Sequence, residues 1–228
     1  MKHFAAYLIA LALSLPACTC AGAKNISGLN EKQFGRYWQV ESESPDYKVT
    51  FAGDTCEVTS PKGLTLWYKK KLSGNIVIEY DAVVFLQKEG DRLSDLNCFW
   101  MASDPKAGSV FKRSAERRGV FANCAQLKLY YLGYGGNHNT TTRFRRYDGN
   151  PEPAVIAEYT DSAHLLKPNH WYHIKLVCNH GRVQYWIDGE CLVDYSDPHP
   201  YTGGWFGFRT TLSRTAISNF KVERLKIR

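Results

Sequence analysis

Apolar and polar side chains alternate with a period of two in a series of short runs along most of the chain. This period places successive side chains on opposite faces of a β-strand. In residues 76–85, for example, Glu79 and Asp81 share one face, whereas Ile78 and Tyr80 share the other. Such runs predict strands at residues 37–41, 48–51, 64–68, 76–85, 98–102, 128–132, 143–146, 155–159, 169–178, 182–187, 204–209 and 216–222.

Turn-forming residues separate these runs, as at Gly53, Gly63 and Gly189. Helical patterns are weak, because no amphipathic stretch exceeds two turns and residues 104–124 show mixed charge without a clean period. We interpret that stretch as a loop with a single helical turn. Many short strands joined by turns predict an all-β fold, a sandwich of two antiparallel sheets. The large residues expected to meet between the sheets are Trp38, Phe51, Ile78, Tyr80, Ile174, Leu176, Phe206, Phe208 and Phe220.

The N-terminal residues follow a different pattern, which is typical of a secretory signal peptide. Lys2 precedes an apolar run at residues 4–15, and small residues follow. The run is shorter than the roughly 20 apolar residues that span a bilayer. Residues 15–18, Leu-Pro-Ala-Cys, are similar to a bacterial lipobox, which predicts lipidation of Cys18. The alternative is ordinary cleavage near Ala21 or Ala23.

This reading divides the chain into a signal or lipoprotein segment at residues 1–23 and one β-sandwich domain at residues 24–228. The protein is then expected to be exported and held by a lipid anchor in the bacterial cell envelope, in the periplasm or at the outer membrane. The anchor is the expected contact with the membrane.

The charge balance bears on the partner. Lysine and arginine number 29 against 22 acidic residues, for a formal net charge of +7. A basic exported domain suits an anionic partner, such as a uronic-acid polysaccharide, lipopolysaccharide or an anionic headgroup. The alternative is that the charge only maintains solubility. Nucleic acid is not expected as a partner of an exported domain.

Seven cysteines are spread along the chain without a C-x-x-C pair, which argues against a zinc site. Export permits disulfides, but a core of this size does not require them, and buried thiols are the alternative. Cys178 and Cys191 flank a predicted hairpin and are the first pair to test. His170 and His173 lack a convincing third ligand. We therefore expect no metal site and no cofactor.

Four segments in the last third occur in a fixed order. A strand carries Trp171, Ile174 and Val177, and a Gly-x-Val-x-x-Trp-x-Asp-Gly hairpin follows at residues 181–189. Residues 204–209 then read Gly-Trp-Phe-Gly-Phe-Arg, and residues 219–222 read Asn-Phe-Lys-Val. This order resembles the C-terminal half of concanavalin A-like lectin/glucanase domains. The resemblance implies a jelly-roll β-sandwich but leaves activity open, because that fold hosts lectins, hydrolases, lyases and inert modules.

Residues 95–102, 129–137 and 139–147 sharpen the match. They are similar to a YesU-like subfamily found in bacterial pectin- and rhamnogalacturonan-degrading systems. The resemblance implies a glycan context and supplies no mechanism.

Residues 130–147 concentrate side chains suited to binding a sugar acid. If Phe144 points into the core, Arg143, Arg145 and Tyr147 lie together on the opposite, concave face, and Arg209 joins them by the same alternation. Arginines there would hold a uronate carboxylate, and aromatic rings would stack on sugar. The alternative is a solvated strand whose arginines pair with Glu79, Asp81 or Glu158. The catalytic candidates are His138, Arg143, Arg145 and Tyr147, and the substrate-binding candidates are Trp100, Tyr134, Asn139 and Arg209.

Three functions fit these residues. A polysaccharide lyase needs a neutraliser for the carboxylate, a base and an acid, and arginine, histidine and tyrosine supply those types. A non-catalytic carbohydrate-binding lipoprotein is the second function, and a structural lipoprotein without a sugar site is the third. A glycosidase is less favoured, because Glu79 and Asp81 share one face at a suitable spacing but no glucanase-type motif accompanies them.

Overall fold

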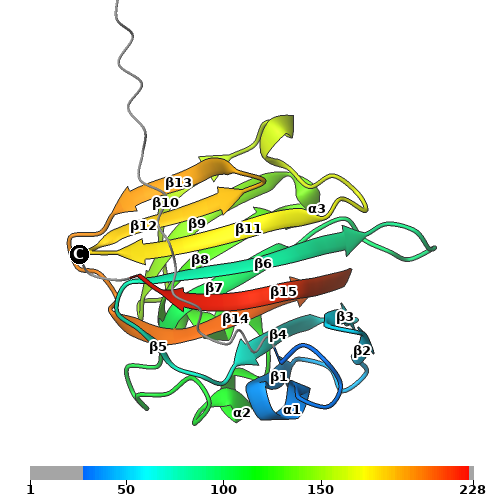
Figure 1. Ribbon diagram of the computed structural model, residues 1–228, viewed down its shortest axis with the longest axis horizontal. Helices are drawn as coiled ribbons and strands as arrows, with labels where there is room; N and C mark the ends of the chain where they lie inside the picture. Colours follow the sequence, from blue (N-terminus) through cyan, green and yellow to red (C-terminus); the bar gives the residue numbers. More distant parts are fainter. Residues whose placement is uncertain (1–27, 226–228) are drawn as a thin grey trace, which may run out of the picture.

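A computed structural model describes residues 28–225 as two antiparallel β-sheets packed face to face (Figure 1). The predicted all-β sandwich is confirmed. The N-terminal segment, including the proposed lipidation site Cys18, lies outside the described residues. Within residues 28–225, no helix has the length and apolar character that crossing a membrane requires.

Sheet 1 has the strand order β1-β4-β14-β7-β8-β9-β10, and the short β5 pairs with β14. Its strands are β1 (Trp38–Ser42), β4 (Gly63–Tyr68), β5 (Leu72–Ser73), β7 (Leu96–Ser103), β8 (Lys128–Gly135), β9 (Thr141–Asp148), β10 (Ala154–Tyr159) and β14 (Gly203–Thr211).

Sheet 2 has the strand order β13-β12-β11-β6-β15-β3-β2. Its strands are β2 (Lys48–Ala52), β3 (Thr55–Thr59), β6 (Ile76–Phe85), β11 (Tyr172–Asn179), β12 (Arg182–Ile187), β13 (Glu190–Ser196) and β15 (Arg214–Arg224). The helical turns are α1 (Phe34–Tyr37), α2 (Ser114–Arg117), η1 (Phe121–Gln126), α3 (Gly136–Asn139) and η2 (Ser162–His164).

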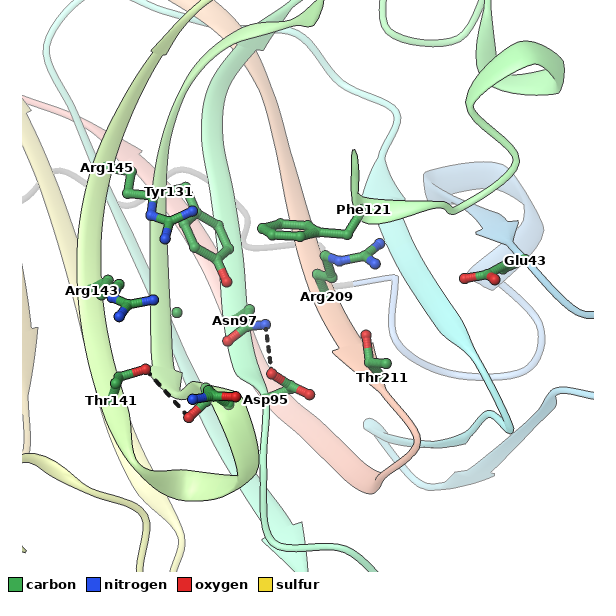
Figure 2. Close-up of a pocket in the computed structure, with 13 residues that line it drawn as sticks. Glu43, Asp95, Asn97, Phe121, Tyr131, Thr141, Arg143, Arg145, Arg209 and Thr211 are labelled. Carbon is green, nitrogen blue, oxygen red and sulfur yellow. Dashed lines mark hydrogen bonds between the residues drawn. The ribbon is translucent and has the colours of Figure 1, made fainter. Parts of the chain in front are cut away.

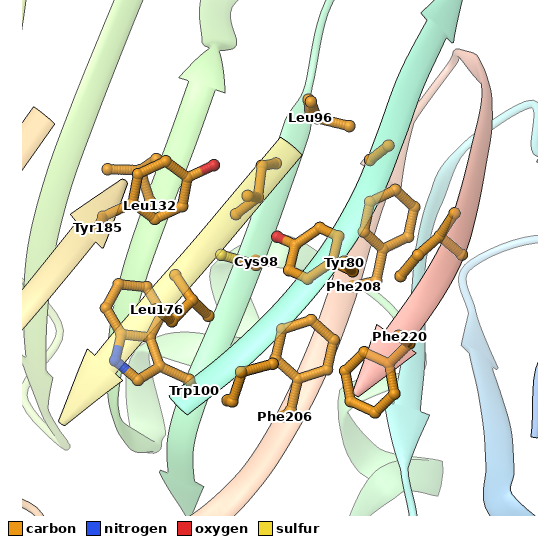
Figure 3. Close-up of a cluster of buried hydrophobic side chains, with 14 of the residues drawn as sticks. Tyr80, Leu96, Cys98, Trp100, Leu132, Leu176, Tyr185, Phe206, Phe208 and Phe220 are labelled. Carbon is orange, nitrogen blue, oxygen red and sulfur yellow. The ribbon is translucent and has the colours of Figure 1, made fainter. Parts of the chain in front are cut away.

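The main core lies between the two sheets and is rich in aromatic rings (Figure 3). Eight of the nine predicted core residues are buried there, and only Phe51, on the edge strand β2, is half-buried. Tyr80 and Phe206 meet edge to face at 5.4 Å, and Phe206 also contacts Phe220 at 5.1 Å. The rows of alternate apolar residues therefore face one another as the period of two predicts.

A second apolar cluster covers part of the outer face of sheet 1. It forms where residues 104–127, here called the covering segment, pack Val110, Cys124 and Leu127 against Trp67 and Phe99. The single helical turn expected in this stretch corresponds to α2, and η1 follows it. What the pattern did not predict is that the segment buries part of an outer sheet face.

A buried ion pair anchors the covering segment to the sheet. The guanidinium of Arg117 donates to the carboxylate of Glu41 at 2.6 Å, and both side chains are almost completely buried. Glu41 also accepts a hydrogen bond from the indole of Trp67 at 3.1 Å. Removing Arg117 would leave the Glu41 carboxylate buried without an ion-pair partner, which costs about 3–5 kcal/mol.

Three strands and one disulfide candidate depart from the sequence-based predictions. β3, β13 and the short β5 occupy stretches in which no strand was predicted. Cys178 and Cys191 are free thiols on β11 and β13, which are separated by β12. Two strand spacings amount to about 9–10 Å, beyond the roughly 7 Å that a disulfide spans between Cα atoms. That pairing was therefore wrong.

Candidate functional site

A pocket of about 340 Å³ opens on the outer face of sheet 1, beside the covering segment (Figure 2). This volume is at the lower end of those that hold small ligands. The pocket is lined by Glu43, Asp95, Asn97, Phe121, Tyr131, Gly133, Gly136, Asn137, Thr141, Arg143, Arg145, Arg209 and Thr211.

The floor of the pocket is one row of residues that are paired across four strands. Arg209 on β14 pairs with Asn97 on β7, Asn97 pairs with Gly133 on β8, and Gly133 pairs with Arg143 on β9. Directly paired residues project on the same side of a sheet. The row therefore carries an arginine at each end, with an amide and a glycine between them.

Gly133 provides the space in the middle of this row. A Cβ atom at that position would lie 2.4 Å from the hydroxyl oxygen of Tyr131 and 2.8 Å from its Cζ atom. The phenol ring therefore lies over the glycine, and Figure 2 shows it between Arg145 and Phe121. Burial raises the pKa of the Tyr131 hydroxyl, which keeps the group protonated at neutral pH. Within residues 28–225 the hydroxyl makes no hydrogen bond, so it is a donor available to a ligand.

Arg209 is a buried cation without an acidic partner. It is 2% exposed and donates to Gly119 O at 3.0 Å and to Thr65 Oγ1 at 3.2 Å, both neutral acceptors. The guanidinium also lies 5.0 Å from the ring centre of Phe121. No carboxylate of the described residues forms an ion pair with it. Glu43 lies close by, because a Cβ atom at Gly63 would be 2.6 Å from Arg209 Nη2 and 3.2 Å from Glu43 Oε2, but its ion pair is with Lys62 at 3.9 Å. Buried charges in proteins are normally paired, so this cation is poised for an anion from outside.

Two of the three arginines of β9, Arg143 and Arg145, line the pocket, and they differ in their pairing. Arg143 forms an ion pair with Glu158 on β10, as the solvated-strand alternative predicted for that carboxylate. Arg145 has no ion pair within the described part of the chain, and its Nε atom is buried without a hydrogen-bond partner. Its neighbour Tyr147 has a pKa raised by burial, an effect that Arg145 opposes. Arg145 and Arg209 are therefore the two pocket arginines without an ion pair among the described residues.

Acceptor atoms lie beside these donors. Asn97 is 5% exposed, and its Oδ1 atom is buried without a hydrogen-bond partner in the described residues. Its Nδ2 atom donates to Asp95 Oδ1 at 3.5 Å (Figure 2). Asp95 is held from behind by the guanidinium of Arg92 at 2.7 Å. The pocket thus combines free donors and free acceptors, which suits a ligand with both kinds of group.

The alternation correctly oriented four of the predicted site residues, of which three line the pocket. Phe144 is buried between the sheets, while Arg143, Arg145 and Arg209 reach the same outer face and line one pocket. Tyr147 also points outward but is buried in the second apolar cluster and does not line the pocket.

Four other predicted residues lie elsewhere. Trp100 and Tyr134 point inward into the main core, because β7 and β8 place Cys98 and Leu132 on that same inner face. Asn139 binds the backbone of Leu166 through both of its amide atoms, so it connects two loops. His138 is exposed on α3 and does not line the pocket. The prediction that Trp100 and His138 share one sheet face with the arginines was therefore wrong, and the substrate-binding candidates Tyr134 and Asn139 do not line the pocket.

Pocket residues that the sequence reading missed come from three places. Asn97 and Tyr131 lie beside or within predicted strands, and their outward alternation relative to Cys98 and Leu132 was a usable signal. Asp95 has a backbone φ of 66° and lies in a loop, where alternation does not apply. Phe121 belongs to the covering segment, whose position no local pattern predicts.

The carboxylate pair considered for glycosidase chemistry and the histidine pair considered for a metal site form contacts away from the pocket. Glu79 forms an ion pair with Lys221, and Asp81 binds His173 at 2.7 Å, all on sheet 2. His170 binds Asp188 at 2.8 Å. The described residues contain no group of three or more histidine, cysteine or acidic side chains arranged to hold a metal ion.

Comparison with known proteins identifies a family and a fold. Residues 58–220 match the family described as a domain of unknown function (DUF6250). No curated protein sequence matches the chain.

Solved structures share the fold at low identity. A Bacillus subtilis protein of unknown function with a galectin-like fold is 17% identical, with a TM-score of 0.71, over 88% of this chain and 94% of that one. The carbohydrate recognition domain of Emp46p is 15% identical, with a TM-score of 0.62, over 90% and 100%. The carbohydrate-binding module CBM66 of Bacillus subtilis is 16% identical, with a TM-score of 0.55, over 82% and 94%. These likenesses establish a galectin-like sandwich.

Proposed function

The chain belongs to the family described as a domain of unknown function (DUF6250), and we propose that its pocket on sheet 1 binds an acidic sugar of a uronate-containing glycan. The observation that carries this proposal is that two pocket arginines, Arg145 and Arg209, have no ion pair among the described residues. A carboxylate bound at either guanidinium would offset the cost of an unpaired charge and form charge-assisted hydrogen bonds. Two arginines on one face also repel each other until an anion is bound.

The other lining groups support a sugar rather than a simple anion. Tyr131 offers a hydroxyl donor, and Phe121 borders the pocket with an apolar ring. Sugar rings have apolar faces as well as hydroxyl edges, so an aromatic ring beside polar groups suits them. Two of the structures that share the fold are described as carbohydrate-binding domains, which supports the same class of ligand.

Calorimetric titration of the protein with oligouronates and matched neutral oligosaccharides tests this proposal. Arg145→Gln and Arg209→Gln are each expected to weaken uronate binding about 10- to 100-fold, the effect of losing a hydrogen bond to a charged group. The melting temperature of Arg145→Gln is expected to change little, because no acidic partner is left behind. Arg209→Gln also removes the buried hydrogen bonds to Gly119 O and Thr65 Oγ1, so it is expected to lower stability as well, and its affinity is measured on the folded protein. Arg182→Gln is the control, since it removes the same charge from sheet 2. Native affinity in both pocket variants would contradict the proposal.

Lyase chemistry is a second function for the same pocket, favoured by the unbonded hydroxyl of Tyr131. The arginines would neutralise the uronate carboxylate and so acidify the adjacent carbon. A pocket carboxylate, Glu43 or Asp95, would take that proton while Tyr131 protonates the departing glycosidic oxygen. Under this proposal, the native protein forms unsaturated uronate, measured by its absorbance, and Tyr131→Phe binds the glycan but forms none. If the native protein binds the glycan without product, the protein is a binding module.

The cellular setting is part of the proposal. A glycan-binding protein anchored through Cys18 in the bacterial cell envelope would retain oligosaccharides released by pectin- or rhamnogalacturonan-degrading enzymes. The net charge of +7 favours such acidic chains.

A further inference from the structure

We infer that the pocket selects acidic sugars whose ring hydroxyls are free, because Asn97 and Asp95 form an acceptor pair beside the arginines. This inference rests on the proposed function, since it concerns the ligand of the same pocket. It names a second requirement for that ligand. A carboxylate alone does not satisfy the site, and neighbouring hydroxyl donors are needed as well.

Asn97 supplies the main observation. It is only 5% exposed, yet its Oδ1 atom has no hydrogen-bond partner among the described residues. The amide orientation follows from Asp95, because the reverse orientation would bring two oxygen atoms together at 3.5 Å. A buried acceptor without a donor is unfavourable, so such groups are rare in folded proteins. In a pocket wall, a ligand hydroxyl can supply the missing donor.

Asp95 adds a fixed carboxylate next to that amide. Arg92 donates to its Oδ2 atom at 2.7 Å, and the Asp95 backbone N–H donates to Gly135 O at 3.2 Å. The Oδ1 atom lies on the Asn97 side, and Figure 2 shows Asn97 between Arg143 and Arg209, with Asp95 below it. A carboxylate has lone pairs for further hydrogen bonds. Asp95 is therefore positioned to accept from a hydroxyl while it holds the Asn97 amide.

The two kinds of group restrict the ligand class. Arg145 and Arg209 require negative charge, whereas Asn97 and Asp95 require hydrogen-bond donors and would repel a second anion. A sulfate lacks the donors at neutral pH, and a neutral sugar lacks the charge. A free uronate residue carries both on one ring. An O-acetyl group removes the donor and adds bulk, so acetylated uronates are excluded even though their carboxylate remains.

The test compares free and modified uronates on the full protein. Trimers of galacturonate, glucuronate, mannuronate and guluronate are titrated by calorimetry, each as the free acid, the O-acetylated acid and the methyl ester. The free acid is expected to bind at least about tenfold more tightly than its O-acetylated form, the effect of one lost hydrogen bond to a polar or charged acceptor. The methyl ester is also expected to bind weakly, because it lacks the charge.

Asn97→Leu removes the acceptor at nearly constant side-chain size. It is expected to weaken binding of the free acid about tenfold and to abolish the preference over the O-acetylated acid, while the melting temperature stays level or rises. A rise would follow from the loss of a buried unsatisfied acceptor, and a purely structural asparagine would instead lose stability. Asp95→Asn removes the negative charge of the side chain and keeps a residue type that tolerates the positive φ at this position. Gln184→Leu on sheet 2 is the matched control.

The outcomes separate the two proposals. Equal affinity for free and O-acetylated acids overturns this inference and leaves the proposed function intact. The absence of binding to every uronate overturns the proposed function and the inference with it. If Asn97→Leu does not fold, the comparison of free and acetylated ligands on the native protein still decides the inference.

Discussion

The substitution Gly133→Ala tests whether the phenol of Tyr131 occupies the middle of the pocket floor. The added Cβ would lie 2.4 Å from Tyr131 Oη, 2.8 Å from Cζ and 3.0 Å from Cε1. Such contacts cannot exist without movement. The ring has little room to move, because its centre lies 5.5 Å from that of Phe99 and 5.3 Å from that of Phe121.

The cost follows from this packing. Adding a methyl group to a well-packed site costs about 1–3 kcal/mol, which lowers the melting temperature of a chain of this size by roughly 2–12 °C. Displacing Tyr131 also alters the pocket, so uronate binding is expected to weaken at least about tenfold. In a Tyr131→Phe background the shortest contact is absent. The same glycine substitution should then cost at least about 0.5 kcal/mol less, a coupling that a double-mutant cycle measures.

Urea unfolding of the native protein, the two single variants and the double variant, with titration of each by an oligouronate, provides the measurement. Gly35→Ala is the control, because a Cβ at Gly35 meets no atom within 4 Å. Unchanged stability and binding in Gly133→Ala would show that the ring does not lie over the glycine. If the glycine substitution costs the same in the native protein and in the Tyr131→Phe background, the two positions are not coupled and the strain lies elsewhere.

Three further predictions concern the core, the acid limit of stability and the N-terminus. Phe208→Ala is expected to destabilise the fold by about 3–5 kcal/mol in urea unfolding, because Phe208 is fully buried between the sheets, and a loss below about 1 kcal/mol would contradict that placement. The hydrogen bond from Arg214 lowers the pKa of Asp91 from 3.8 to about 2, so the stability from this pair is complete above about pH 4 and is lost as the pH falls towards 2. Asp91→Asn should remove that part of the acid dependence in pH-resolved thermal unfolding, and an unchanged acid profile would refute the assignment. Cys18→Ser is expected to move the protein from the membrane fraction to the soluble fraction, and a membrane-bound, acyl-labelled variant would exclude lipidation at Cys18.

Several features could be predicted because they depend on neighbours in the sequence. A period of two is a local property of a strand, and it placed Phe144 inward and Arg143 and Arg145 outward. The same rule placed Phe208 on the inner face of the sheet and Arg209 on the outer face. The sandwich class followed from the number and length of such runs.

For β7, the sequence pattern does not show which side chains point inward. Seven of its eight residues are buried, because sheet 2 covers one face and the covering segment covers much of the other. The strand therefore lacks a solvated polar face, and its pattern of apolar residues does not reveal that Trp100 points inward. Its register with β8 also shifts between Trp100 and Ser103, which changes the phase further along the strand.

Residues close together along the chain thus predicted most of the strands, the faces of those that alternate clearly, and the arginines on the outer face of sheet 1. Only the tertiary structure decided which strands adjoin, and so which side chains share a pocket. Arg209, Asn97, Gly133 and Arg143 form one row because β14, β7, β8 and β9 are neighbours in sheet 1. Strand order depends on how the whole core is buried, and the covering segment that leaves Arg209 buried without an acidic partner packs by contacts distant in sequence.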